Sequence, residues 1–434
     1  DGQAARTAQR TESLFGRRGR GWVGPTDRLA TSTDAGFAAL IARPELADHV
    51  IQLTRIRANR HLLLPREQQA VVAELRGDGI EGWGNLYDRV SGQLRVRIGE
   101  ETLSVGQAQN RLGSTDREER AAALAGIREA WSSTEDSCAQ ALTHIVGWRQ
   151  RVNDRRGVDE LADTLARNRL TRGTLDAMME ASAGARPLLE RYFTAKAGLM
   201  GIAEGTLGWE DSAAPLPAPD AEQAWPEAEA FILEHFHSYN PELADFAKRA
   251  FDGRWIEAED RGGKRQGGWC ANLPAQGESR IFMTHGGNFR STVTLAHELG
   301  HAYHNWVTRD LPLSRRQITS TLAETASVFA ESLVRDAALE AASSRQARLA
   351  MLDARLSAGA SFLMNLPARY NFERALYPLR REGPFDPAQL SELMERCQRE
   401  AYGDALSSWF PEFWAAKLHF YISHFAFYNY PYTF

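Results

Sequence analysis

The chain has 434 residues, of which 43% are hydrophobic and 25% are charged, and its formal net charge is −5. This length can bury a large core and could form two or three domains. The slight acidic excess excludes the broad basic surface that nucleic-acid binding requires. No apolar run in the sequence reaches the roughly 18 residues of a membrane helix. We therefore expect a globular protein with neither a nucleic-acid nor a membrane partner.

The N-terminal part is predicted to be helical, with one short strand. Residues 1–33 are rich in arginine and glycine, and we expect a mobile or truncated segment there. Apolar residues at helical spacing predict a helix over residues 34–73. The alternation in Leu94–Ile98 predicts a strand. A capping box at Thr115–Glu118 opens a long helix, and Thr174–Leu199 forms another.

The second part is also predicted to be helical. Residues 211–226 are rich in proline and are expected to form a surface loop or a domain junction. A helix over residues 227–251 follows, and the alternating residues 279–287 predict a short strand that ends on glycines. Further along, helical patterns cover residues 345–380 and 386–402.

The stretch Thr294–His304 reads TLAHELGHAYH and contains H-E-x-x-H. On a helix, His297 and His301 are spaced i and i+4, so both imidazoles leave one face and can bind one zinc ion. Glu298 is then placed to take a proton from a zinc-activated water. Helix-start signals precede the motif, with Ser291 or Thr292 as the expected cap. Glycine at position 300 destabilises a helix by about 1 kcal/mol relative to alanine. Such a small residue indicates close approach by another backbone or by a substrate.

A second helix, predicted over Thr319–Val334, can supply the third metal ligand. Glu324 lies among small residues, where a packed carboxylate needs a compensating partner such as zinc. Glu331 lies about two turns further on the same face and could hydrogen-bond a ligand histidine. His304 is expected to pack near the metal without binding it, because a catalytic zinc with three protein ligands keeps one position open.

The motif HELGHAYH, followed by LAETASVFAE, resembles the thimet oligopeptidase and oligoendopeptidase F family of zinc metallopeptidases. That family carries H-E-x-G-H-x-x-H and then a glutamate helix of the form E-x-x-S-x-x-x-E. The resemblance implies His297, His301 and Glu324 as zinc ligands, with Glu298 as the general base. It also implies a mainly α, zincin-like clamshell with a deep channel, a small β element beside the metal helix, and cleavage of short peptides.

An edge strand beside a metal helix can bind an extended substrate through its unpaired backbone groups. We predict that Ile281–Gly287 has this role, although an ordinary core hairpin is an open alternative. His285, within that segment, is interpreted as a surface histidine rather than a substrate contact.

The C-terminal run Trp414–Tyr432 is rich in tyrosine and histidine. Peptide hydrolysis passes through a tetrahedral oxyanion, and phenol O–H or imidazole N–H groups are suitable donors to it. The resemblance implies a histidine and tyrosines with this role, and we choose His419 and Tyr428. The register leaves open the alternatives His424, Tyr430 and Tyr432.

We therefore predict a zinc metalloendopeptidase with one zinc ion per chain, acting on short unfolded peptides. One alternative is a helical zinc carboxypeptidase, which would need a cationic group to hold the substrate carboxylate. The other is a non-catalytic, zinc-stabilised peptide-binding fragment, although a structural site would need no base at Glu298. Peptide length, side-chain preference and oligomeric state are not predicted.

The predicted division is a segment at 1–33, a helical part at 34–210, a loop at 211–226 and a catalytic domain at 227–434. Because the chain starts at Asp1 and ends inside an aromatic run, we expect missing sequence at both ends, including part of the catalytic domain. Three scattered cysteines argue against a disulfide framework, and no secretory signal is recognisable, so we predict a cytoplasmic location.

Overall fold

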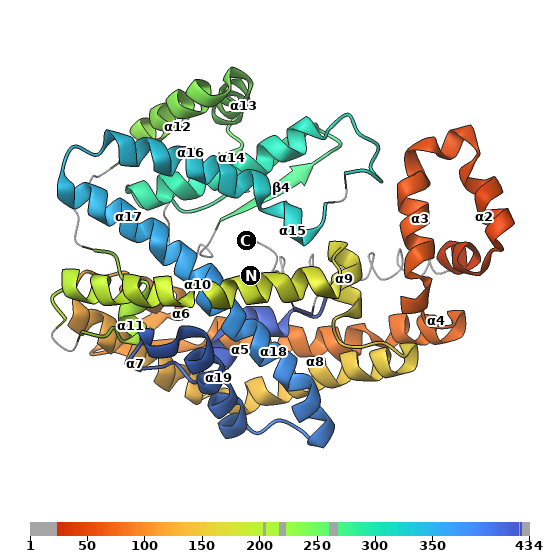
Figure 1. Cartoon of the computed structure of the whole chain (residues 1–434), viewed down its shortest axis with the longest axis horizontal. Helices are drawn as coiled ribbons and strands as arrows, with labels where there is room; N and C mark the ends of the chain where they lie inside the picture. The colour runs from red at the N-terminus through yellow and green to blue at the C-terminus, as the bar shows by residue number, and fades with distance from the viewer. Residues whose placement is uncertain are drawn as a thin grey trace.

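The computed structural model describes residues 24–202, 205–216, 223–259, 268–316, 318–424 and 426–427. The described chain is mainly helical, which confirms the predicted fold class. Figure 1 shows the helices gathered in two halves, one above the other, with α17 running from the upper half to the lower. No helix among the described residues is long and apolar enough to cross a membrane.

The lower half is built mostly from the first part of the chain. Its helices are α5 (Gly82–Gln93), α6 (Val105–Arg111), α7 (Arg117–Ser132), α8 (Glu135–Arg156), α9 (Ala162–Asn168), α10 (Arg172–Leu199) and α11 (Trp209–Ser212). The hairpin β1 (Arg95–Ile98) and β2 (Glu101–Ser104) packs against α7 and confirms the predicted strand.

The first helices stand at one side of the molecule (Figure 1). They are α2 (Asp34–Ile41), α3 (Val50–Ala58) and α4 (Arg66–Leu75), joined by 3₁₀ turns. The prediction of one continuous helix over residues 34–73 is wrong. The helix is interrupted at two prolines: Pro44 begins the first 3₁₀ turn, and Pro65 precedes α4. Proline breaks a helix because it lacks an N–H donor and its ring clashes with the preceding turn.

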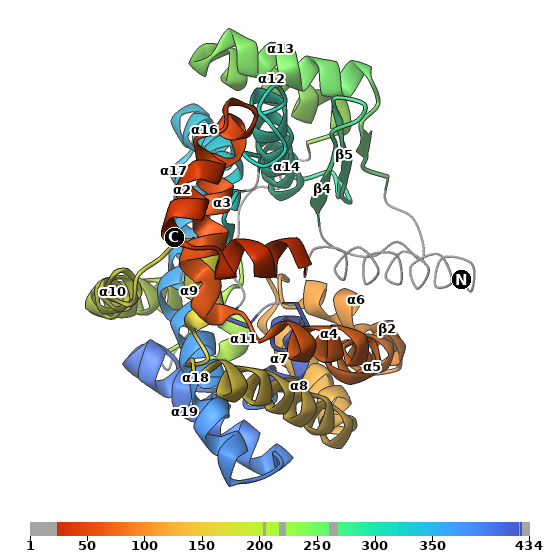
Figure 2. The same ribbon diagram turned by 90° about the vertical axis from the view of Figure 1, so that its right-hand side faces the viewer.

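The upper half contains α12 (Trp225–Tyr239), α13 (Pro241–Asp252), α14 (Phe289–Val307), α15 (Ser320–Ala323) and α16 (Thr325–Ala341). It also contains a small sheet of β3 (Ile256–Glu257), β5 (Glu278–Phe282) and β4 (Trp269–Leu273), in that order across the sheet. Figure 2 shows this sheet on one side of α14 and α16 on the other. The central helix α14 therefore touches both layers of its half.

The chain returns to the lower half through α17 (Arg345–Ala360), a π turn, α18 (Leu366–Glu382) and α19 (Pro387–Tyr402). The predicted helical stretch over residues 345–380 is confirmed, with a π-helical turn at Ser361–Asn365 inside it. The last elements are α20 (Phe413–Ala416) and the 3₁₀ helix η6 (Leu418–Tyr421).

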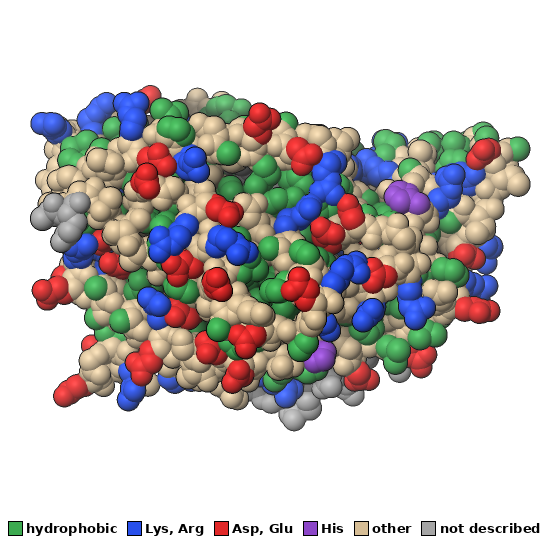
Figure 3. All heavy atoms as spheres, turned by 60° about the horizontal axis from the view of Figure 1, so that its bottom comes forward, with side chains coloured by type: hydrophobic (Ala, Val, Ile, Leu, Met, Phe, Trp, Pro, Cys, Tyr) green, Lys and Arg blue, Asp and Glu red, His purple; other side chains and the backbone are tan. Residues whose placement is uncertain are grey.

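The buried apolar residues form separate clusters in the two halves. The upper cluster joins α12, α13, α14, α16 and the sheet. The largest lower cluster joins α5, α7 and α8 with α18, α19 and η6. That cluster contains residues from before and after the proline-rich loop. The loop therefore does not separate two hydrophobic cores, and the predicted domain division at residues 211–226 stays a prediction. On the face shown in Figure 3, acidic and basic side chains are interspersed.

Candidate metal centre

The helix α14 is positioned by its cap and its apolar face. Asn288 is the N-cap and accepts a hydrogen bond from the Ser291 N–H at 3.0 Å, so the cap lies earlier than the predicted Ser291 or Thr292. Residues such as Leu295 and Leu299 are fully buried in the upper cluster. The histidines of the motif leave the opposite, partly exposed side of the helix.

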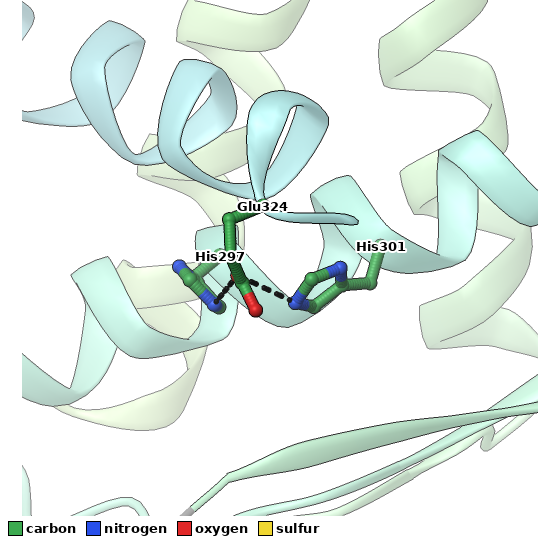
Figure 4. Close-up of side chains that lie close together, drawn as sticks. All are labelled: His297, His301 and Glu324. Carbon is green, nitrogen blue, oxygen red and sulfur yellow. Dashed lines mark ion pairs between the residues drawn. The ribbon is translucent and has the colours of Figure 1, made fainter. Parts of the chain in front are cut away.

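His297, His301 and Glu324 come together as the sequence predicted (Figure 4). The Nε2 atoms of both histidines lie 3.2 Å from Oε2 of Glu324. Their donor atoms all lie within 4.8 Å of one another, and no other group of this kind occurs among the described residues. Glu324 stands at the junction between α15 and α16, so the predicted single helix is in fact two.

Hydrogen bonds from His297 and His301 hold the pKa of Glu324 well below its usual range, although burial opposes them. Ser327, one turn along α16, donates to the same Oε2 atom at 2.8 Å. Ser327 is the serine of the E-x-x-S pattern, and that pattern alone does not show its contact with the carboxylate. These contacts keep the carboxylate ionised, which is the form that binds a metal.

Glu331 contacts Nδ1 of His297, the ring nitrogen that does not face Glu324. Its Oε2 lies 3.3 Å from Nδ1 of His297, while Arg335 donates to its Oε1 at 2.6 and 2.8 Å. Burial alone would lower the pKa of His297, but Glu324 and Glu331 outweigh it and raise the pKa to about 9. Arg335 was not predicted as part of the site, although its i+4 spacing from Glu331 on one helix indicates such a pair.

Glu298 lies in the same helix but outside the cluster of metal-binding atoms. It is only 4% exposed, and burial raises the pKa of its carboxyl group. Gly268, just before β4, passes so close that a Cβ atom there would lie 2.5 Å from Oε1 of Glu298. Within the described residues, Oε2 has no hydrogen-bond partner. Glu298 is therefore a buried carboxyl group beside the metal-binding atoms, and one of its oxygens has no hydrogen bond to any residue that the structure describes.

A cavity of about 510 Å³ opens from the metal-binding atoms toward α17 and α18. His297, Glu324 and His419 all line it, so η6 brings the predicted histidine to the same cavity. Burial first, and then Lys417 and Arg369, lower the pKa of His419 to about 3.

The other candidates for oxyanion donors divide into two groups. His424 is exposed, and its Nδ1 lies 2.9 Å from an Arg76 nitrogen. It does not line the cavity. Tyr428, Tyr430 and Tyr432 lie outside the described residues.

The prediction that Ile281–Gly287 is an edge strand is wrong, because β5 is the central strand of the sheet. β5 pairs with β4 on one side and with β3 on the other, and the following residues continue this pairing through Met283 and His285. The edge strand is instead β4, which packs beside α14. The parallel pairing of β3 joins distant segments, and the sequence offered no sign of it.

His285 and His304, the other histidines considered in the sequence, lie outside the group of metal-binding atoms. His285 packs edge-on against Trp225, and its Nδ1 accepts a hydrogen bond from the Gly287 N–H. Its interpretation as a surface histidine is therefore corrected to a half-buried one. Burial and the neighbouring His301 lower the pKa of His304, whose side chain lies outside the cluster of metal-binding atoms.

The donor set fits zinc chemically. Two imidazole nitrogens and one carboxylate oxygen converge, and zinc takes these ligands in catalytic sites that keep a fourth position open. The contacts of Glu324 keep its carboxylate ionised, which is the form that binds a metal, and Glu331 orients the imidazole of His297 from its other ring nitrogen.

The family model for Peptidase family M3 matches residues 218–434. Oligopeptidase PepF of Bacillus subtilis (strain 168) is 24% identical over 381 residues, which cover 85% of this chain and 56% of that protein. The chromosomal oligoendopeptidase F of Lactococcus lactis subsp. cremoris is 24% identical over 343 residues, covering 77% and 56%. The chain thus spans little more than half the length of these relatives. The resemblance seen in the motifs is confirmed.

Solved structures share the fold. The oligoendopeptidase-F of Enterococcus faecium matches with a TM-score of 0.71 at 19% identity, over 98% of this chain and 72% of that one. PZ peptidase A with inhibitor 2 matches with a TM-score of 0.75 at 16% identity, over 98% and 75%.

Proposed function

Because the chain belongs to peptidase family M3, we propose that it is a zinc-dependent endopeptidase that hydrolyses internal bonds of short peptides. The observation that carries the proposal is the convergence of His297, His301 and Glu324 beside the buried Glu298. A purely structural zinc site would need no buried carboxyl group next to it.

His297, His301 and Glu324 would hold one zinc ion per chain. When bound, zinc lowers the pKa of a water molecule and polarises the scissile carbonyl. Glu331 and Ser327 hold the ligands in place, since each contacts a ligand side chain directly. This arrangement leaves the cavity side of the site open to a substrate.

Glu298 acts as the general base and then as the general acid. It accepts a proton from the attacking water and delivers it to the leaving amine. The raised pKa of its buried carboxyl group suits both steps, because a general base works best when its pKa lies near the working pH.

His419 donates its imidazole N–H to the developing oxyanion. Its lowered pKa keeps the ring neutral at physiological pH, and a neutral imidazole still carries one N–H donor. Tyr428 is proposed as the second donor on the resemblance alone.

The substrate backbone pairs with the edge of β4 that no other described strand occupies. Gly268 and Trp269 begin this edge next to Glu298, so a peptide extended along it would pass over the base. Backbone pairing accepts many sequences, which suits a peptidase that acts on varied short, unfolded peptides.

The cytoplasmic location, together with the absence of nucleic-acid and membrane partners, stays a prediction.

The test is cleavage of a short quenched fluorescent peptide blocked at both ends, before and after chelation and zinc addition. We expect internal cleavage that zinc restores, and Glu298→Gln should lower kcat/KM about 10²–10⁴-fold. Glu340→Gln, an exposed glutamate of α16, is the matched control.

Other outcomes select the alternatives. Cleavage only of peptides with a free C-terminus would indicate the carboxypeptidase. One equivalent of bound zinc with no cleavage of either peptide would indicate the non-catalytic binding fragment.

A further inference from the structure

We propose that Trp269 is a specificity-determining residue that binds an aromatic side chain of the substrate. This inference rests on the proposed function, and it adds a substrate class to it: short peptides with an aromatic residue beside the cleaved bond. The substrate ring would pack on the exposed indole ring of Trp269, at the edge of the sheet next to the general base.

Trp269 lies on the face of the sheet that is turned away from α14, which we call the outer face. Successive side chains of a strand point to opposite faces. Cys270, the next residue of β4, packs against the upper cluster, and its register partner Ile281 is buried in that cluster together with residues of α14. Trp269 and its register partner Phe282 therefore share the other face. There, 53% of Trp269 is exposed.

The indole ring already has one aromatic neighbour in the protein. Its centre lies 5.8 Å from that of Phe282, and the two ring planes differ by 21°, so the rings are stacked. Phe282 belongs to β5, which lies toward the centre of the sheet. On the other side of β4, no strand follows among the described residues. Phe282 thus supports the indole from one side, and a ligand at the edge of β4 would meet its other side.

Trp269 directly follows the residue that lies against the general base. A Cβ atom on Gly268 would be 2.5 Å from Oε1 of Glu298. A peptide paired with the edge of β4 would extend the sheet, so its side chains would alternate between the same two faces. The substrate residue that pairs with Trp269 would therefore direct its side chain to the outer face, close to the bond that Glu298 serves.

An aromatic substrate side chain at this position would extend the stack from two rings to three. Opposed side chains of paired strands have Cβ atoms about 4.5–5.5 Å apart, and an aromatic pair is stabilised beyond the area that it buries. The substrate residues on either side would point toward α14 instead. We therefore expect selection by Trp269 for an aromatic residue at one position, and no selection by Trp269 at the two neighbouring positions.

The experiment moves one phenylalanine through a short peptide that is blocked at both ends and has alanine at the tested positions. Mass spectrometry locates the cleaved bond, and kcat/KM is compared with that of the alanine peptide at each position. We expect the zinc-loaded protein to gain about 2–10-fold at a position beside the cleaved bond, mainly through a lower KM. No gain at any position would overturn the proposal.

The variants test whether the gain comes from the indole ring. Trp269→Ala should bring the phenylalanine-to-alanine ratio of kcat/KM close to one, and Trp269→Phe should keep part of the gain. Because the ratio is taken within one protein, a smaller folded fraction does not change it. Tyr239→Ala is the matched control: Tyr239 is 58% exposed and packs against an aromatic ring, but it lies on α12 outside the sheet. A ratio that persists in Trp269→Ala, or falls equally in Tyr239→Ala, would overturn the proposal.

A binding measurement separates this inference from the proposed activity. The zinc-loaded Glu298→Gln protein is titrated by calorimetry with each phenylalanine peptide and with the alanine peptide. Tighter binding of a phenylalanine peptide, lost in the additional Trp269→Ala variant, supports the subsite even if the parent cleaves no peptide. Equal affinities, or binding of none of the peptides, would refute it. A failure of cleavage while this difference in affinity is present would refute only the peptidase.

Discussion

Gly300 of α14 lies directly against Ser327 of α16, so closely that a Cβ atom on residue 300 would be 2.7 Å from the Cα of Ser327. The carbonyl oxygen of Ala326 would be closer still, at 2.6 Å. The two helices that carry the metal-binding residues are therefore in backbone contact. This contact sets the distance between the two histidines and Glu324.

We expect Gly300→Ala to destabilise the fold by about 1–3 kcal/mol, because backbone atoms must move to admit the methyl group. Urea unfolding measures the loss. Zinc affinity should fall as well, since α16 carries Glu324 away from α14. Gly184→Ala is the control: residue 184 is exposed in α10, with no atom within 4 Å of its Cβ position. Alanine there should stabilise the helix by up to about 1 kcal/mol. Equal effects of both changes would contradict the argument.

The sequence predicted this contact only in part. A glycine inside the motif indicated a close neighbour, but the neighbour could have been substrate. The local patterns were sufficient for His297, His301, Glu298 and Glu324, because spacing along a helix fixes which side chains share a face. Glu331 was placed by the same rule.

Features that depend on distant segments could not be predicted. The edge strand was assigned to residues 281–287 because the parallel partner β3 leaves no local signal. His419 and His424 lie five positions apart in one aromatic run, and only the packing of η6 against α5 and α8 turns the first into the cavity. The breaks in the helix predicted over residues 34–73 fall at Pro44 and Pro65, which are local signals in the sequence.

Glu331→Gln is expected to weaken zinc binding about 10–100-fold, as is usual when a carboxylate behind a ligand histidine is lost. The amide cannot offer a charged acceptor to Nδ1 of His297, and it also releases Arg335. Competition with a chromophoric chelator measures the affinity. Glu340→Gln, on the same helix but exposed, should leave the affinity as it is. If both variants bind zinc like the parent, Glu331 does not tune the site.

Lys196→Met should destabilise the protein by about 3–5 kcal/mol, because it leaves the charge of Asp353 buried. Nζ of Lys196 lies 3.1 Å from Asp353, joining α10 to α17, and both residues are almost fully buried. Adding Asp353→Asn should recover part of the loss by removing the orphan charge. The surface pair Lys248–Asp252 is the comparison, and Lys248→Met should have a much smaller effect in urea unfolding. Similar losses at both sites would show that burial is not the cause.

The half-buried His419 should make the fold sensitive to acid. Its pKa of about 3 in the folded protein lies below the value of 6.5 expected when unfolded, so between these values the unfolded chain binds the extra proton. Stability from this residue is complete above about pH 6.5 and is lost as the pH falls toward 3. From about pH 7.5 to about pH 5, the parent should lose up to about 2 kcal/mol more than His419→Gln. Urea unfolding at both pH values measures this difference. His424→Gln, which removes an exposed histidine of the same run, should behave like the parent, and an equally acid-sensitive His419→Gln would show that the ring titrates freely.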